Sequence, residues 1–266
     1  MAFGPDNRFQ TGGSAWAQPF GRSTAVDAAQ IDAGLRAYML RVYNWMASGL
    51  LLTGIVAYLI ANTGAAELFY QVVRTPRGNA VAPTILGWIA MFSPLVFVLV
   101  LSFGINRMSK TTAQALFWAF CAVMGASMAN IFAIYTATSI ASTFFITAAM
   151  FAGVSLYGYT TKADLTRMGT FMMMGLIGII IASLVNLFIG STALQFAISV
   201  LGVVIFVGLT AYDTQRIKAD YLEYAYAEGT DEAAKRSVFD ALGLYLNFIN
   251  LFQFMLQFMG VRQNSE

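Results

Sequence analysis

Seven long apolar runs limit what this chain can fold into more than any other feature. Each holds about 20 residues, which is the length a helix needs to cross a hydrocarbon core of roughly 30 Å. Such runs are too long for barrel strands, and a helix satisfies the backbone of an uninterrupted apolar segment in lipid. The runs are Val42–Ala61, Leu86–Ile105, Ala113–Tyr135, Ile140–Tyr159, Gly169–Ile189, Ala193–Tyr212 and Ala241–Gly260. They predict an all-α membrane protein with seven transmembrane helices.

Composition supports this class and excludes several kinds of chemistry. Of the 266 residues, 58% are hydrophobic and 11% charged, which leaves too little polar surface for a soluble domain. The chain has no histidine, which excludes histidine-assisted catalysis, histidine zinc sites and histidine pH sensing. Cys121 is the only cysteine, so no disulfide forms within the chain. No lysine follows Lys235, so the last run cannot supply the Schiff-base amine of a retinal protein. We expect neither an enzyme, nor a bound cofactor, nor a nucleic-acid partner.

The basic residues are distributed unevenly between the two ends of the runs. If every run crosses the membrane once, three lie on the side opposite the N-terminus, namely Arg74, Arg77 and Arg262. Besides Arg8 and Arg22 in the N-terminal tail, ten lie on the side of the N-terminus: Arg36, Arg41, Arg107, Lys110, Lys162, Arg167, Arg216, Lys218, Lys235 and Arg236. The positive-inside rule then predicts a cytosolic N-terminus and an outside C-terminus. A re-entrant last segment would reverse the C-terminus.

The flanking and connecting segments divide the chain into three parts. Residues 1–38 contain Gly, Ser and Ala with mixed charge and no signal-peptide pattern, which predicts a flexible cytosolic tail. Residues 39–260 form the predicted transmembrane domain, and residues 261–266 a short C-terminal tail. The longest charged connection, Arg216–Ser237, is predicted to be a solvated, partly helical cytosolic loop.

Asp213 is the polar residue that helix packing explains least. It ends the apolar run from Phe196 to Tyr212, so its carboxylate would face the negative end of the helix dipole close to hydrocarbon. A carboxylate in that position needs a cation, a proton or a polar partner.

The other polar side chains within the runs are mainly amides. Interhelical hydrogen bonding is the commoner use of buried amides in membranes, although each of these could also line a pathway. They are Asn130, Asn186, Gln195, Asn247, Asn250, Gln253 and Gln257. The last four follow steps of three, three and four residues, which places them on one stripe of the seventh helix. A helix with such a stripe needs protein or water around it, so we expect it at the centre of the other six.

Two stretches resemble the signature helices of the Bax inhibitor-1, or transmembrane Bax inhibitor motif, family. They are Gly208–Lys218, with the sequence GLTAYDTQRIK, and Ala241–Phe252, with the sequence ALGLYLNFINLF. Gly104–Ser109 and Leu156–Lys162 are similar to segments of its bacterial members. The resemblance covers Tyr43 to Gly260. It implies six helices around a central seventh in a bacterial inner (plasma) membrane, and a pH-sensitive calcium leak.

The resemblance also implies a site near the cytosolic face. In the family a pair of aspartates, one in each signature helix, shares this site. Asp213 matches the first aspartate, and Asn247 stands where the second usually is. Two close carboxylates can share a proton and offer Ca²⁺ charged oxygens, whereas an Asp–Asn pair keeps a hydrogen bond but loses one negative charge. The resemblance makes these two residues an ion or proton site, with Asp213 as the candidate Ca²⁺ ligand.

Asp240 has two interpretations. It lies seven residues before Asn247, which is two turns or about 10 Å along the same helical face, so it could supply the second carboxylate nearer the cytosol. Alternatively, Asp240 and Ser237 form a capping box at the start of the last helix, where an acid suits the helix dipole.

Two arginines are candidate latches for Asp213. Arg107 ends the second run on the predicted cytosolic side, and Arg216 lies one turn after Asp213, so either could neutralise the carboxylate. The sequence leaves two functions open. One is a Ca²⁺ or H⁺ leak or sensor closed around Asp213, and the other is a non-conducting protein that regulates a membrane protease or membrane-protein quality control.

Overall fold

The structure is a bundle of helices and is a computed structural model that describes residues 20–75, 78–104, 108–224 and 230–263. The helices are α1 (Phe20–Ala61), α2 (Ala66–Phe69), α3 (Ile85–Gly104), α4 (Lys110–Met128), α5 (Ile131–Ile134), α6 (Ala137–Thr160), α7 (Thr166–Ile189), α8 (Thr192–Tyr224) and α9 (Thr230–Met259). The strands are β1 (Tyr70–Thr75) and β2 (Gly78–Pro83).

The expected class of all-α membrane protein is confirmed. Within the described residues, six helices are long and apolar enough to cross a membrane, and Ile85–Val100 of α3 is a shorter apolar helix. The third predicted run is divided, because α4 ends at Met128 and the short α5 carries the chain on to Tyr135.

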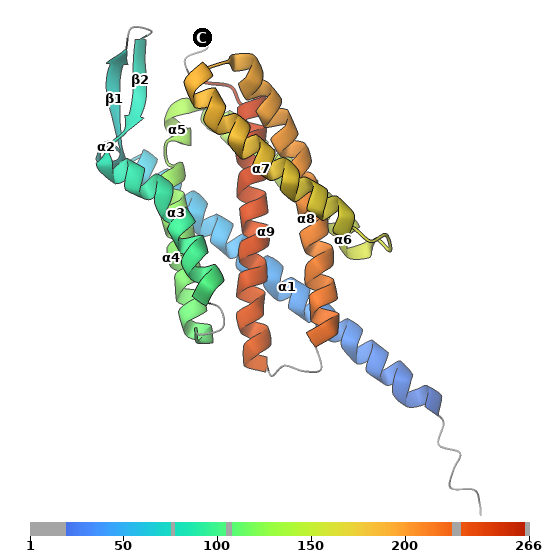
Figure 1. Ribbon diagram of the computed structural model, residues 1–266. Coiled ribbons are helices and arrows are strands. Elements are labelled where there is room, and N and C mark those ends of the chain that lie inside the picture. The colour runs from blue at the N-terminus through green and yellow to red at the C-terminus, as the bar shows by residue number, and fades with distance from the viewer. Residues whose placement is uncertain (1–19, 76–77, 105–107, 225–229, 264–266) are drawn as a thin grey trace, which may run out of the picture.

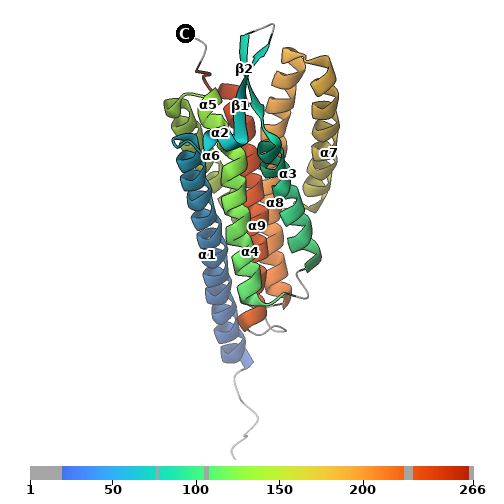
Figure 2. The same ribbon diagram turned by 90° about the vertical axis from the view of Figure 1, so that its left-hand side faces the viewer.

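Helix α9 is the most enclosed of the six long helices. It packs against α1, α4, α6 and α8, whereas α3 packs mainly on α4 and α7 on α8 (Figures 1 and 2). In its most apolar window 61% of α9 is buried, against 39% or less for the other five. The surrounding helices fully bury several of its side chains, among them Leu244, Tyr245 and Leu251.

Tyr245 anchors the main core between α1, α4 and α9. Its ring meets Phe117 and Phe120 edge-on, with centroids 6.2 and 5.6 Å apart. Its hydroxyl lies 2.6 Å from the Thr53 hydroxyl, which itself donates to the carbonyl oxygen of Cys121 at 2.9 Å. The polar tip of a large buried ring is thus satisfied within the bundle.

A glycine contact fixes α6 against α8 close to Asp213. A Cβ atom on Gly158 would lie 2.3 Å from the carbonyl oxygen of Ala211. Only glycine permits so close an approach between these two backbones.

A β-hairpin on the α1–α3 connection was not predicted from the sequence. β1 and β2 pair antiparallel from Tyr70↔Pro83 to Thr75↔Gly78 and rise beside the end of the bundle where α7 and α8 join (Figure 1). The Tyr70 hydroxyl donates to the Ser127 carbonyl oxygen at 2.9 Å, which ties the base of the hairpin to α4. A search for apolar runs of membrane-spanning length cannot detect such short strands.

Three helices extend beyond the predicted runs. α1 begins at Phe20, within the segment expected to be a flexible tail, and residues 1–19 lie outside the described residues. α8 continues to Tyr224, and α9 begins at Thr230. The connection expected at Arg216–Ser237 is therefore helical at both ends. Its helical part keeps apolar contacts, since Ile217 is buried in the main core.

Candidate functional site

Asp213 lies inside α8 rather than at its end, which corrects the expected helix boundary. The helix continues because Thr214 and Ile217 are buried on the face that packs into the bundle. The Asp213 carboxylate therefore does not face the negative end of the helix dipole. Its polar partners are neighbouring side chains.

Each carboxylate oxygen of Asp213 has one partner. The Asn247 amide Nδ2 donates to Oδ2 at 2.7 Å, which joins α8 to α9. Arg216 Nη2 lies 3.1 Å from Oδ1, one turn along the same helix. The Asp213 side chain is 14% exposed and that of Arg216 is 45% exposed. The fold thus brings Asp213 and Asn247 together, as the family resemblance implied. It also brings Arg216, one of the two latch candidates, to the same carboxylate.

Asp240 makes a different contact. The Tyr38 hydroxyl donates to Asp240 Oδ2 at 2.5 Å and so links α9 to α1. The capping interpretation is wrong, because α9 begins at Thr230 and the Ser237 hydroxyl donates to the Ala234 carbonyl oxygen inside the helix. Arg216 forms its ion pair with Asp213, while its charge and that of Arg236 also act at longer range on the Asp240 carboxylate.

The other latch candidate, Arg107, lies outside the described residues. In the part of the chain that the structure describes, no group of three or more Asp, Glu or Cys residues is arranged to hold a metal ion. Asp213 therefore offers an ion a single carboxylate, with the Asn247 amide beside it.

Two cavities lie along the amide stripe of α9. The first, of about 650 Å³, is an open hollow between α7, α8 and α9, and its polar lining includes Asp213, Asn247 and Asn250. The second, of about 430 Å³, lies between α9 and the α3–α5 region and is lined by Asn130, Asn250, Gln253 and Gln257. Leu246 and Asn250 line both cavities, so the two cavities adjoin at these side chains.

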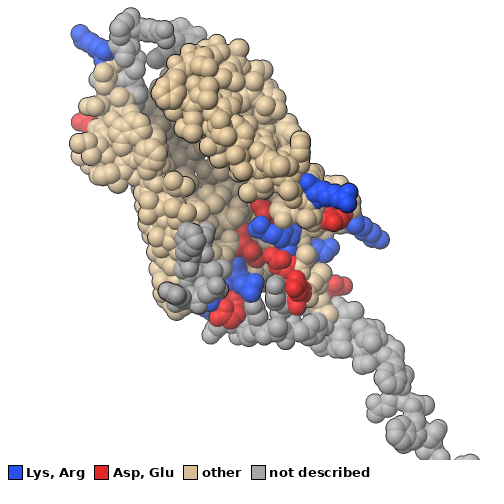
Figure 3. Space-filling view, viewed as in Figure 1, with Lys and Arg blue, Asp and Glu red and all other residues tan. Residues whose placement is uncertain are grey.

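The surface above these cavities is hollowed. Figure 3 shows an indentation between the part of the surface that α3 forms and the part that α7 forms, with uncharged surface on both sides. Most of the charged side chains visible in this view gather below it, over the lower ends of α8 and α9 (Figure 3). The Asp213 cavity therefore lies toward the charged end of the bundle and the second cavity toward the other end.

A chain of amides closes that other end. Gln195 Nε2 donates to Gln257 Oε1 at 2.8 Å, and the Ser199 hydroxyl donates to the same oxygen at 3.2 Å. Asn186 Nδ2 donates to Gln195 Oε1 at 3.3 Å, and its Oδ1 accepts from the Ser191 backbone N–H at 3.0 Å. Asn186 and Gln195 therefore tie the α7–α8 turn to the end of α9, and Asn186 lines neither of the two cavities.

Sequence reasoning missed Tyr38 and Ser199. Tyr38 lies 202 residues before its partner Asp240, and Ser199 lies 58 residues before Gln257. Neither separation follows a helical repeat, so no local pattern could have revealed these contacts.

Comparison with known proteins gives consistent matches over the whole bundle. A family model described as "Inhibitor of apoptosis-promoting Bax1" matches residues 35–264. An uncharacterized protein of Caulobacter vibrioides is 48% identical over 245 residues, which cover 91% of this chain and 96% of that protein. Uncharacterized protein RP147 of Rickettsia prowazekii is 47% identical over 88% of this chain and 93% of its own length. Inner membrane protein YbhL of Escherichia coli K12 is 45% identical over 92% of this chain and 99% of its own length.

Proposed function

This chain belongs to the Bax inhibitor-1 family, and from that premise we propose that it forms a leak pathway for Ca²⁺ or H⁺ across a bacterial inner membrane. The membrane is proposed from the relative that is named an inner membrane protein. The pathway runs along α9 and is closed at its cytosolic end by Asp213, Asn247 and Arg216. In this proposal α3 is the seventh spanning helix and α9 the central one.

The observation that carries the proposal is the pair of cavities that meet at Leu246 and Asn250. Three of the four amides of the stripe line the second cavity and two line the first, with Asn250 shared between them. Amide oxygens and a carboxylate are the ligands that hard cations prefer. Polar side chains inside a membrane commonly mark such pathways. Helix α3 supports the seven-helix count, because 20 residues rise about 30 Å, which matches the hydrocarbon core.

The closed end is held by contacts of unequal strength. The Arg216–Asp213 pair joins residues three apart on one helix and is half exposed, so we expect it to contribute only about 0.2–0.5 kcal/mol. The Asn247–Asp213 hydrogen bond joins two helices and is shielded from solvent. A cation that reaches Asp213 from the second cavity would therefore displace Arg216 at little cost while Asn247 holds the carboxylate in place.

The pH response follows from the amide at position 247. Because the described residues place an amide and no second carboxylate against Asp213, the pair lacks the like-charge repulsion that makes two close acids share a proton. We therefore propose that the flux depends only weakly on pH near neutrality.

The second candidate is a non-conducting protein that regulates a membrane protease or membrane-protein quality control. It is favoured by α7, whose apolar window is only 11% buried. Phe171, Ile181 and Phe188 are among its exposed side chains, and a partner helix could pack on this face.

Flux through liposomes that contain the purified protein tests the proposal. Asn250→Leu should reduce Ca²⁺ or H⁺ flux several-fold, because it puts an apolar side chain where the two cavities meet. Asn62→Leu is the matched control. Asn62 Nδ2 donates to the Tyr58 carbonyl oxygen as Asn250 Nδ2 donates to that of Leu246, but Asn62 lies at the exposed end of α1. If the wild-type protein carries neither ion at any pH and co-purifies with a large membrane partner, the second candidate replaces the first.

A further inference from the structure

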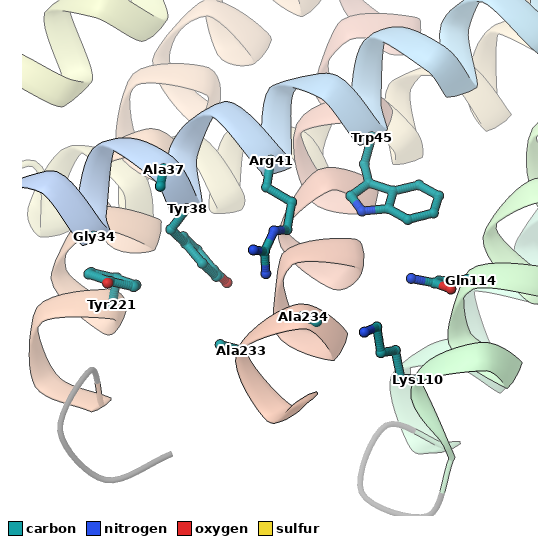
Figure 4. A pocket seen from close by; sticks show the side chains of 10 residues that line it. All are labelled: Gly34, Ala37, Tyr38, Arg41, Trp45, Lys110, Gln114, Tyr221, Ala233 and Ala234. Carbon is teal, nitrogen blue, oxygen red and sulfur yellow. The ribbon is translucent and has the colours of Figure 1, made fainter. Parts of the chain in front are cut away.

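A third cavity, of about 600 Å³, lies at the charged end of the bundle, apart from Asp213. It is bounded by α1, by the end of α8 and by the first turns of α4 and α9 (Figure 4). The side chains that give it its chemistry are Tyr38, Arg41, Trp45, Lys110, Gln114 and Tyr221. None of them is part of the two cavities along the amide stripe.

Among the described residues, the lining carries two cationic side chains, Arg41 and Lys110, and no carboxylate. Lys110 also makes an interaction of its own within the protein. Figure 4 shows the Arg41 guanidinium, the Lys110 ammonium group and the Gln114 amide directed into the same space from α1 and α4. In the described part of the chain no hydrogen bond or ion pair joins Arg41 to another residue. Asp240 on α9 accepts a hydrogen bond from the hydroxyl of Tyr38, whose side chain lines the cavity. Two cations held beside one cavity favour an anion between them.

The helix ends add to this potential. α4 begins at Lys110 and α9 at Thr230, and the first turn of each helix borders the cavity, so the partly positive N-terminal ends of both helices are close to it. Ser109 caps α4 by accepting from the Thr112 backbone N–H at 3.2 Å, which fixes the start of the helix and with it the position of Lys110.

Aromatic rings form the rest of the wall. The rings of Tyr38 and Tyr221 lie 4.9 Å apart, and Trp45 packs edge-on against Phe117 at 5.7 Å. Arginine and tryptophan near the end of a membrane helix are typical of the headgroup level of a bilayer. The volume is far greater than a bare phosphate ion requires and lies in the usual range for organic ligands.

We propose that this cavity binds a phosphate-bearing anion with an organic part. The Arg41 guanidinium would hold two phosphate oxygens in its planar fork, Lys110 would add a second charge, and the aromatic wall would contact the organic part. Phosphate esters of this kind come from two sources, the headgroup of an anionic phospholipid or a soluble cytosolic compound. The site is independent of the proposed leak, because none of its residues lines that pathway.

Binding to the whole protein in nanodiscs separates the sources. One arm titrates phosphatidylglycerol into phosphatidylcholine nanodiscs, and the other adds soluble glycerol 3-phosphate to nanodiscs of phosphatidylcholine alone. The readout in both is the rise in Tm with ligand concentration. Loss of a charge-assisted hydrogen bond in Arg41→Gln should weaken the apparent affinity by about tenfold or more.

Arg36→Gln is the matched control, because Arg36 is an exposed cation on the same helix but lines a groove toward α6 instead. Lys110→Gln gives a second comparison if Arg41→Gln does not fold, since Lys110 is exposed at the first residue of α4. A response to either ligand that Arg41→Gln or Lys110→Gln weakens and Arg36→Gln does not supports the site, and the responding arm names the source. If neither ligand raises the Tm of the wild-type protein, or if Arg36→Gln weakens binding as much as Arg41→Gln, the proposal is overturned.

Discussion

The contact between Asp213 and Asn247 predicts a measurable coupling free energy between α8 and α9. The perturbation is a double-mutant cycle with Asp213→Ala, Asn247→Ala and the combined variant. Since both side chains are largely shielded and the donor–acceptor distance is 2.7 Å, truncating either one removes a charge-assisted bond that water replaces poorly.

The magnitude follows from the type of bond. Neutral hydrogen bonds between membrane helices contribute about 0.6 kcal/mol on average, and an ionised partner roughly doubles the strength. We therefore expect a coupling of about 1–2 kcal/mol for residues 213 and 247. A second cycle pairs Asp213→Ala with Arg216→Ala. The Arg216 side chain is 45% exposed, and its coupling should stay near 0.2–0.5 kcal/mol, as for other exposed pairs on one helix.

Unfolding in mixed detergent and SDS micelles, followed by circular dichroism, measures both cycles under one condition. Strict additivity for residues 213 and 247 would show that the hydrogen bond adds nothing to stability. A larger coupling for Arg216 than for Asn247 would refute the view that the amide, and not the arginine, holds the carboxylate.

Three further predictions concern the pH response, the orientation and the packing. Asn247→Asp places two carboxylates within hydrogen-bond distance, so Ca²⁺ flux should become pH dependent near neutrality, where the wild-type flux changes little. An unchanged pH profile would show that residues 213 and 247 do not share a titrating site. In a cysteine-free background, a membrane-impermeant thiol reagent should label Ser191→Cys on intact cells and Glu232→Cys only after lysis. The reverse pattern would show that the proposed orientation in the membrane is wrong. Gly158→Ala brings a Cβ atom to 2.3 Å from a backbone oxygen of α8 and should lower the free energy of unfolding by about 1–3 kcal/mol. Gly153→Ala, with no atom within 4 Å of the added Cβ, should leave it nearly unchanged, and equal effects of the two variants would contradict the close helix contact.

The helical membrane class was predictable because it depends on local properties. A run of about 20 apolar residues has only one way to satisfy its backbone in lipid, whatever the rest of the chain does. The spacing of the amides in the last run also determined, before any tertiary contact, that Asn250, Gln253 and Gln257 share a face of α9. That face lines the two cavities in the structure.

Residue pattern alone did not pair Asp213 with Asn247, which lie 34 positions apart. That pairing was expected from the family resemblance, and the amide at position 247 was visible in the sequence as a departure from it. The extent of α8 and α9 was misjudged because the polar residues after Asp213 marked a boundary by composition, whereas buried Ile217 keeps the helix packed. A local acid-capping pattern at Ser237 and Asp240 was misleading for the same reason.

Only the tertiary structure decided which helix faces meet. The contact of Tyr38 with Asp240 spans 202 positions, and the cavity beside Arg41 combines residues from α1, α4, α8 and α9. The bilayer thickness sets the length of each apolar segment independently of the other segments, so this length can be read from the local sequence. The partners of Asp213, Asp240 and Arg41 depend instead on how helices far apart in the sequence pack, which no single segment encodes.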